Sequence, residues 1–409
     1  MRILILTQYY YPEPVEKVHD LACGLVRLGH DVHVITGFPC YPKGEIYPGY
    51  QQSLSFQEEI DDVHVTRIPQ FPDHSGSVFR RALYYLSFTL SAATIGLLKS
   101  QKADVILVYL AAMPIGLAGW VISRLRGIPM VLDVVDIWPE SVIASGMVRD
   151  GLVARLIRAT ARFIYRKAHH INVVTPGFKR NLLSYGVPEE KLSVIHNWMP
   201  LGTYKRVDPD PDLAEKEGLQ GRFNVIYAGS MGRVQNLETV LDAAEQLTDL
   251  PEVQFVLIGD GLEYPKLVEK ARQKGLSNMR FLGRRAPEAM PAYYASADVL
   301  LVHLKPDILS DVSIPSKTFA YMACGRPILM AVRGDAEVFV KEHRLGLGIE
   351  PSNPARLAEA VRQFYTMPAA MRSAIGEHAH RVYLENYSSE VQIRKWSNVL
   401  IGVAEVKRV

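Results

Sequence analysis

The chain has 409 residues, and its length and composition already restrict the class of protein. Apolar residues make up 48% and charged residues 22%, which excludes wholesale disorder and predicts a globular protein of two or three domains. A formal net charge of +3 is too small to indicate a nucleic-acid carrier. Cys23, Cys40 and Cys324 lie far apart without metal-ligand spacing, so we expect no disulfide framework. We therefore expect the protein to reside in a reducing cytosol.

The positive charge is concentrated in the first half. Residues 1–200 hold 20 Lys and Arg against 17 Asp and Glu, whereas residues 201–409 hold 26 and 26. Residues 151–180 contain no acidic residue. Within them, four arginines are spaced so that a helix would present them on one face: Arg155, Arg158, Arg162 and Arg166. This basic stripe is either a solvated helix face or a surface that meets anionic lipid headgroups or pyrophosphate.

Strand and helix patterns alternate through the first half, as in parallel sheets covered by helices. The apolar run at 1–8 is too short for a signal peptide. A loop at 9–15 leads into a helix that ends near residue 28. The expected strands are 2–6, 32–36, 63–68, 105–110, 129–134, 171–174 and 192–196.

Two uncharged stretches raise the question of a membrane. Residues 105–123 are long enough to span a bilayer, but they read as a strand, a turn and a helix followed by another strand, so we reject a transmembrane assignment. Residues 82–98 form a mixed polar and apolar helix flanked by basic residues. That helix either packs in the core or rests on a membrane surface.

The alternation breaks at 197–211, a proline-rich candidate linker, and then restarts. The second half predicts strands at 224–227, 254–258, 279–282, 298–302 and 327–331, helices near 236–248 and 262–274, and a final helix at 388–403. Glycine turns follow strands at 229–232 and 259–261, and Ser316 and Lys317 begin a helix after a proline. Small residues there let backbone N–H groups approach phosphate, so together these turns favour a phosphate-rich ligand.

Several segments resemble a known family over nearly the whole chain. They are residues 10–14, 29–36, 133–141, 227–238, 258–263, 281–284, 290–298 and 314–328. Together they resemble the retaining family-4 glycosyltransferases with the GT-B fold. The strings at 136–141 and 314–317 are similar to a branch that makes bacterial surface polysaccharides, the N-acetylfucosamine transferases.

The resemblance implies an α/β protein with two doubly wound Rossmann-like domains facing across a cleft. We expect residues 1–200 to form an acceptor-binding domain and residues 201–385 to bind the nucleotide sugar. Residues 386–409 would form a C-terminal helix that crosses back to the first domain. Splitting the chain in this way assigns the excess positive charge to the acceptor domain.

The resemblance also implies roles for individual residues. On the donor side, Gly283 and Arg284 would lie by the base, Glu263 beside the nucleotide, and four residues around the diphosphate: Gly232, Arg233, Ser316 and Lys317. On the acceptor side, Lys17 and His19 belong to a segment, 12–19, that would close over both substrates. Asp136 would lie near the reacting centre or cap a strand end, and Glu140 would contact the acceptor or act as a cap. We expect Asp136, Arg233 and Lys317 to be the catalytic residues.

Three departures from the family pattern stand out. The two glutamates that usually hold the ribose and the donor sugar are replaced by Val312 and Ala320. The usual Arg and Lys of the diphosphate loop correspond to Ser230 and Gln235, for which Arg233 and Lys317 are the expected substitutes. The expected glycine pair near 15–16 is Val-Glu.

The resulting prediction is a metal-independent retaining transferase without a cofactor. It would move an N-acetylated hexosamine or deoxyhexosamine from a UDP-sugar to a polyprenyl-diphosphate-linked saccharide. We expect it on the cytoplasmic face of the membrane, bound to anionic lipid and to no nucleic acid. Two alternatives remain open: a GT-B-fold nucleotide-sugar 2-epimerase, and a non-catalytic nucleotide-sugar-binding subunit.

Overall fold

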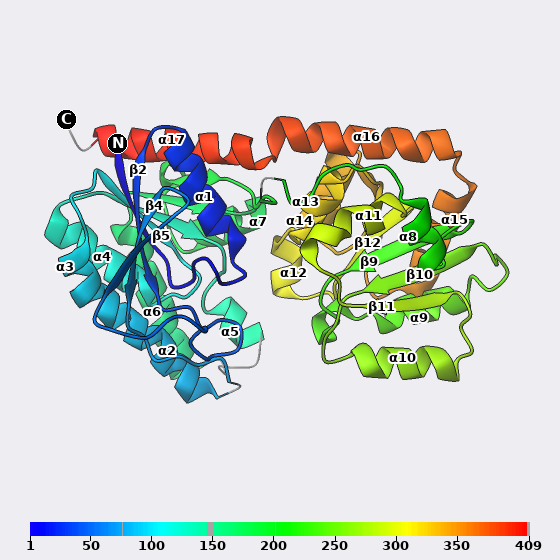
Figure 1. The fold of residues 1–409 in the computed structure, drawn as a ribbon, viewed down its shortest axis with the longest axis horizontal. Coiled ribbons are helices and arrows are strands. Elements are labelled where there is room, and N and C mark those ends of the chain that lie inside the picture. The colour runs from blue at the N-terminus through cyan, green and yellow to red at the C-terminus, as the bar shows by residue number, and fades with distance from the viewer. Residues whose placement is uncertain (76, 145–150, 201, 407–409) are drawn as a thin grey trace. The chain divides into compact units, whose positions relative to one another are not determined.

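The computed structural model describes residues 1–75, 77–144, 151–200 and 202–406 (Figure 1). The chain divides into two compact units: unit 1 contains Met1–His196 and the segment from Ser389 onward, and unit 2 contains Asn197–Ser388. The divisions fall near the expected boundaries at 200 and 385. The expected domain start at 201 and the last three residues of the expected C-terminal helix lie outside the described residues.

Within the described ranges, unit 1 is built on an eight-stranded sheet of order β3-β4-β2-β1-β5-β6-β7-β8. Its strands are β1 (Arg2–Leu6), β2 (Asp31–Gly37), β3 (Phe56–Ile60), β4 (Val63–Ile68), β5 (Val105–Tyr109), β6 (Met130–Val134), β7 (His170–Val173) and β8 (Leu192–Val194). All neighbours pair in parallel except β3 and β4. The central strands are continuous buried apolar runs, as expected of a sheet covered on both faces.

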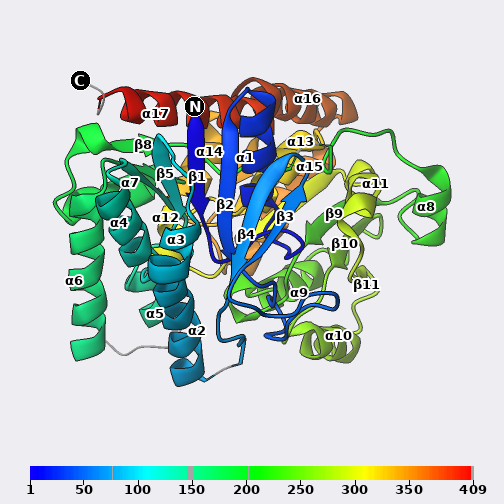
Figure 2. The same ribbon diagram turned by 60° about the vertical axis from the view of Figure 1, so that its left-hand side comes forward.

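Along the chain of unit 1, helices lie between most of the strands, but β2, β3 and β4 follow one another without a helix between them. Figure 2 shows the helices of unit 1 beside its sheet. They are α1 (Glu16–Arg27), α2 (Val78–Ser91), the π-helix η1 (Ala92–Gly96), α3 (Leu97–Lys99), α4 (Ile115–Arg126), α5 (Glu140–Ala144), α6 (Leu152–Lys167), α7 (Pro176–Ser184), the 3₁₀ turn η2 (Glu189–Lys191) and α17 (Ser389–Val406).

Helix α17 belongs to unit 1 because it packs on α1. A Cβ atom added at Gly24 would lie 2.4 Å from Ile393 Cδ1, so the glycine lets the two helices approach closely. The Ser389 hydroxyl donates to Asp20, and His30 and Ser397 are 2.8 Å apart.

The helical segment Val78–Lys99 is the part of the described chain that is long and apolar enough, by length and composition, to cross a membrane. Only 22% of its most apolar window is buried inside the protein. Of the two expectations for this helix, core packing and contact with a membrane surface, core packing therefore accounts for a minority of the window.

Unit 2 contains, in its described part, a six-stranded parallel sheet of order β11-β10-β9-β12-β13-β14. The strands are β9 (Phe223–Ala228), β10 (Val253–Ile258), β11 (Met279–Gly283), β12 (Val299–His303), β13 (Ile328–Ala331) and β14 (Gly346–Gly348). Its helices are α8 (Pro211–Lys216), η3 (Arg233–Gln235), α9 (Glu238–Glu245), α10 (Tyr264–Gln273), η4 (Pro287–Ala289), α11 (Met290–Ala295), α12 (Ile308–Val312), α13 (Lys317–Ala323), α14 (Asp335–Glu342), α15 (Pro354–Thr366) and α16 (Ala369–Asn386). Apolar clusters on both faces of the sheet form its core.

Candidate functional site

In unit 2, the loops that follow β9, β10 and β11 are tied together through their backbones. The Gly259 amide donates to the Gly283 carbonyl at 2.9 Å, and the Glu263 amide donates to the Met231 carbonyl at 2.9 Å. A Cβ atom at Gly259 would lie 1.9 Å from the Gly229 carbonyl oxygen, and its φ is +142°, so no other residue fits there. The structure therefore brings the predicted glycine turns together at the carboxyl end of the sheet, where open parallel sheets bind ligands.

Lys317 lies beneath the first of these loops. Its Nζ is 3.8 Å from the centre of the Tyr227 ring, and a Cβ atom at Gly229 would come within 2.7 Å of it. Burial lowers the pKa of Lys317 from 10.5 to about 7. In the part of the chain that the structure describes, no carboxylate forms an ion pair with it. A desolvated ammonium without a counter-ion is an electrostatic site for an anion.

His303, at the end of β12, shares these surroundings, although no local pattern in the sequence indicates it. Its Nδ1 is 2.7 Å from the Gln235 carbonyl oxygen, and the Ser352 amide donates to its Nε2 at 3.3 Å. Burial lowers the pKa of His303, and the nearby charge of Lys317 lowers it further. The ring therefore braces the loop that contains Gln235 against the turn at Ser352.

Arg233 and Glu263 contact each other. Arg233 Nε lies 3.5 Å from Glu263 Oε1, and its side chain is 89% exposed. Lys266 also approaches Glu263, at 3.8 Å. Of the two expected substitutes, Arg233 is thus an exposed surface cation paired with the residue expected beside the nucleotide, whereas Lys317 is partly buried.

The other expected donor residues occupy the rim of the same region. Gly283 ends β11 with a φ of +67°, Arg284 is exposed directly after it, and Ser316 is exposed immediately before α13. The Gly232 amide donates to Gln235 Oε1 at 2.9 Å. Gln235, where the family pattern has a cation, therefore closes the loop instead of supplying charge.

The two positions that lack the family glutamates are not equivalent. Ala320 is buried in the core of unit 2, among the residues packed under the sheet. Val312 ends α12, and the residue before it, Asp311, forms a bidentate ion pair with Arg333, with contacts of 3.0 and 2.6 Å. The carboxylate of Asp311 thus lies one residue from the position of one missing glutamate, Val312. At the other position, the buried Ala320 supplies no carboxylate.

In unit 1, Asp136 follows β6 and is partly buried. The Ser141 hydroxyl donates to its carboxylate. Burial raises the pKa of Asp136, whereas hydrogen bonds from Ser141 and the Ile137 amide lower it. The hydrogen bond from Ser141, at the start of α5, is a local contact of the kind expected if Asp136 acts as a cap. The Asp136 carboxylate can still accept a hydrogen bond from a further donor.

Lys17 is held by the buried carboxylate of Asp133, for which the sequence predicts no individual role. Its Nζ lies 3.0 Å from Asp133 Oδ2, and Asn172 donates to Asp133 Oδ1 at 3.0 Å. The Asp133 side chain is only 1% exposed. The ion pair ties the first turn of α1 to the end of β6, the strand that precedes Asp136.

His19 is held by contacts within unit 1. Its Nδ1 lies 3.0 Å from the Tyr10 hydroxyl, and its Nε2 lies 3.0 Å from Asp61 Oδ2. Cys23, one helical turn further on, lies 3.6 Å from the ring. Of the described residues, His19, Cys23 and Asp61 form the group whose ligand atoms are close enough to hold a metal ion. An acceptor would have to displace one of these contacts to reach a ring nitrogen.

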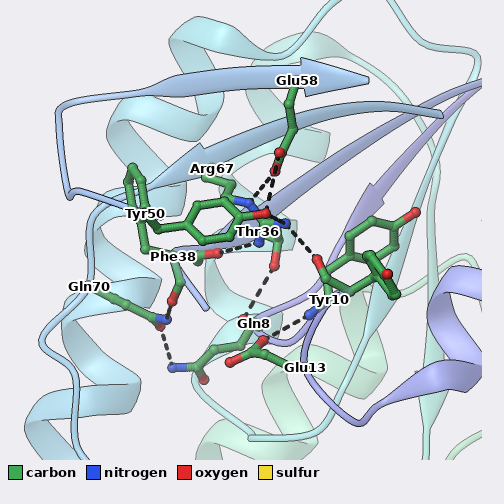
Figure 3. A network of polar contacts seen from close by, with 11 residues as sticks. Gln8, Tyr10, Glu13, Thr36, Phe38, Tyr50, Glu58, Arg67 and Gln70 are labelled. Atoms are coloured by element: carbon green, nitrogen blue, oxygen red, sulfur yellow. Dashed lines mark hydrogen bonds and ion pairs between the residues drawn. The ribbon is translucent and has the colours of Figure 1, made fainter. Parts of the chain in front are cut away.

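The loop before α1 is fixed by two buried charged residues (Figure 3). Glu13 accepts from the Tyr10 amide at 3.0 Å, a contact drawn in Figure 3. It also accepts from the amides of Cys40 and Tyr41 at 2.8 and 2.7 Å. Arg67 is fully buried, pairs with Glu58, and donates to the Tyr11 carbonyl at 2.5 Å. Burial raises the pKa of Glu13, and the three amides oppose that rise. These contacts give the loop a defined shape without the glycine pair of the family pattern.

Glu140 and the basic stripe meet at Tyr185. The Tyr185 hydroxyl donates to Glu140 Oε1 at 2.9 Å, and Arg158 also hydrogen-bonds this hydroxyl. Arg162 lies over the same ring, 5.8 Å from its centre. Arg155, Arg162 and Arg166 are exposed, whereas Arg158 is half-buried. The stripe is therefore divided. Arg158 is half-buried and contacts Tyr185, which donates to Glu140, whereas the other three arginines are exposed to solvent.

Comparison with known proteins matches both units. A family model described as "Glycosyl transferase 4-like domain" matches residues 14–198, and one described as "Glycosyl transferases group 1" matches residues 222–367. The chain is 26% identical to WcaI of Escherichia coli, named as a colanic acid biosynthesis glycosyl transferase, over 90% of this chain and 93% of that one. It is 26% identical to alpha-galactosylglucosyldiacylglycerol synthase of Streptococcus pneumoniae, over 60% and 63%.

The fold is also that of a solved structure. Anabaena HepE in complex with UDP superposes with a TM-score of 0.72 at 18% identity, covering 98% of this chain and 100% of that one. Together, the two parallel-sheet units and the two family matches identify the chain as a glycosyltransferase with the GT-B fold. The predicted α/β fold class is therefore confirmed.

Proposed function

We propose that this glycosyltransferase transfers a sugar, with retention, from a UDP-sugar to a polyprenyl-diphosphate-linked saccharide in the synthesis of a bacterial surface polysaccharide. The sugar would be an N-acetylated hexosamine or deoxyhexosamine. The observation that carries the donor assignment is the partly buried ammonium of Lys317, which no carboxylate pairs with among the described residues, under the interlocked glycine loops. The name of the Escherichia coli relative and the UDP bound to HepE support the same chemistry.

The proposed mechanism depends on where charge develops. Transfer gives oxocarbenium character to the anomeric carbon and negative charge to the departing diphosphate, so cations placed beforehand lower the barrier. Lys317 would hold that charge from below, and Arg233 would swing in from the surface by leaving Glu263. The departing phosphate itself would accept the proton of the acceptor hydroxyl on the same face.

On the acceptor side, Asp136 would orient the attacking hydroxyl or support the positive charge. Its partial burial and its hydrogen bond from Ser141 suit a carboxylate that must accept one more hydrogen bond. Lys17 would act through Asp133, by fixing α1 against β6, instead of contacting the acceptor directly. Arg155, Arg162 and Arg166 would meet the anionic membrane, since these side chains are exposed.

The test is a panel of nucleotide sugars incubated with the full-length protein and membranes that contain lipid-linked acceptors. Transfer of label to lipid from one UDP-sugar, slowed by about 10²-fold in Asp136→Asn, would support the proposal. Conversion of a UDP-sugar without any acceptor would instead support the 2-epimerase. Calorimetric binding of a UDP-sugar with no transfer to any acceptor would support a non-catalytic subunit.

A further inference from the structure

Unit 1 contains an apolar groove between α2, α4 and α6 with a volume of about 300 Å³. The three helices are neighbours, since α4 packs against both α2 and α6. The walls are Leu86 from α2, Leu117 from α4, and Val153, Leu156 and Ile157 from α6. A cavity of this size is at the lower limit for small-molecule sites, so it has room for part of one flexible chain.

One end of the groove adjoins the candidate reacting centre. Tyr85 and Trp138 form its aromatic wall, with ring centres 6.2 Å apart in an edge-to-face arrangement. Trp138 is two residues after Asp136, and Val142, also in the wall, follows the Ser141 that holds this carboxylate. Burial raises the pKa of Tyr85, and the Asp136 charge adds to that rise, as expected for neighbours.

The Trp138 indole provides a second observation at the same place. The side chain is only 7% exposed, yet within the described part of the chain its Nε1 has no hydrogen-bond partner. A buried N–H group is normally satisfied, so an unpaired one that lines a cavity indicates a missing acceptor. A phosphate or saccharide oxygen at the mouth of the groove would satisfy it.

The outer surface around the groove is unusually apolar and is edged by cations. Phe79, Leu90, Leu152 and Leu156 are 77%, 68%, 83% and 67% exposed. Arg81 lies in the groove wall, and the exposed arginines of α6 occupy the next sector of that helix. Surfaces that lie in the headgroup region of a bilayer typically combine apolar side chains with arginines in this way.

We infer that this groove holds the first isoprene units of the lipid-linked acceptor, with the diphosphate at the Trp138 end and the rest of the chain continuing into the membrane. This inference rests on the proposed function and names how its acceptor is held. Two features favour one isoprenoid chain over the paired acyl chains of a phospholipid: the narrow volume, and the position of Tyr85, Trp138 and Val142 in the groove wall beside Asp136 and its partner Ser141. The chain end that reaches Asp136 must carry the reacting sugar, so the occupant is the acceptor itself.

The test is photolabelling of the full-length protein with farnesyl diphosphate that carries a diazirine in its terminal isoprene, in the absence of any nucleotide sugar. We expect saturable labelling, mapped by mass spectrometry to α2, α4 and α6. Thr160→Trp should fill the groove and reduce the labelling by about tenfold. Ala159→Trp is the matched control, because Thr160 lines the groove whereas the adjacent Ala159 is exposed.

The outcomes separate this inference from the proposed function. Labelling at other sites, equal labelling of both variants, or equal displacement by phosphatidylglycerol vesicles and by unlabelled farnesyl diphosphate would overturn the groove assignment. Matching melting temperatures of the two variants exclude a folding defect as the cause. If labelling behaves as expected but no UDP-sugar supports transfer, the groove assignment stands and the donor proposal fails.

Discussion

Replacing Lys317 by methionine tests the donor site through stability as well as activity. Holding the ammonium in its buried position lowers its pKa from 10.5 to about 7. At about 1.36 kcal/mol per pKa unit, this corresponds to an upper limit of about 5 kcal/mol of destabilisation of the folded state. Methionine has a similar length and no charge, so Lys317→Met should remove that penalty, and we expect a gain of about 2–5 kcal/mol at pH 6.

The sign of the pH dependence follows from proton binding. Below pH 7 the ammonium is charged in the folded and unfolded states, and the full penalty applies. Between pH 7 and 10.5 the unfolded chain binds this proton and the folded chain releases it, so wild-type stability increases with pH relative to the variant. The melting temperatures of the two proteins, measured by calorimetry at pH 6 and pH 9.5, should therefore converge at the higher pH.

UDP binding should favour the charged form of Lys317, whereas folding favours its neutral form. A diphosphate beside the ammonium restores its charge, so binding at pH 8 should take up protons, as calorimetry in buffers of different ionisation enthalpy would detect. Lys317→Met should abolish this uptake and weaken UDP binding by about 10- to 100-fold. Lys341→Met, which removes an exposed lysine paired with Glu337, is the control. A pH-independent difference in melting temperature, or wild-type UDP affinity in Lys317→Met, would refute the reasoning.

Three further predictions concern other contacts. Burial raises the pKa of Asp136 above its ordinary value of 3.8, so the acid limb of the kcat/KM profile should lie above pH 3.8, and Asp136→Asn should lower kcat by about 10²-fold and remove that limb. Gly259→Ala should abolish UDP binding in calorimetry because of the 1.9 Å clash, whereas Gly275→Ala, also at positive φ but with open space around it, should retain binding. Glu58→Gln should leave the buried charge of Arg67 uncompensated and destabilise the protein by about 3–5 kcal/mol; a change below 1 kcal/mol in urea unfolding would contradict this account.

The sequence predicted the elements whose signals are local. The strands at 2–6 and 63–68 have the expected bounds, because an apolar run bounded by polar turns identifies a buried strand without reference to the rest of the chain. Strand β3 was missed because Phe56–Ile60 is a polar edge strand whose residues alternate weakly. Helix α16 was missed for a similar reason: its apolar residues are spread around the helix, so it lacks one clear face.

The candidate site shows the same limit. The glycine turns were predictable, since each follows its own strand, but the pairing of Lys17 with Asp133 spans 116 residues and leaves no local pattern. The brace formed by His303 was equally invisible, because its partners come from the 235 and 352 turns. Gln235 was interpreted as a lost cation, whereas its amide oxygen has a structural task that only the loop geometry reveals.

The assignment of α17 to unit 1 has a consequence for how the protein is made. Most of unit 1 precedes unit 2 in the chain, yet α17 is synthesised only after every residue of unit 2. Until then the α1 surface around Gly24 that receives Ile393 is uncovered. Unit 2 is continuous in sequence and can close its own sheet as it leaves the ribosome, since domains fold as units during synthesis. The half of the protein that is translated first is therefore the half that is completed last.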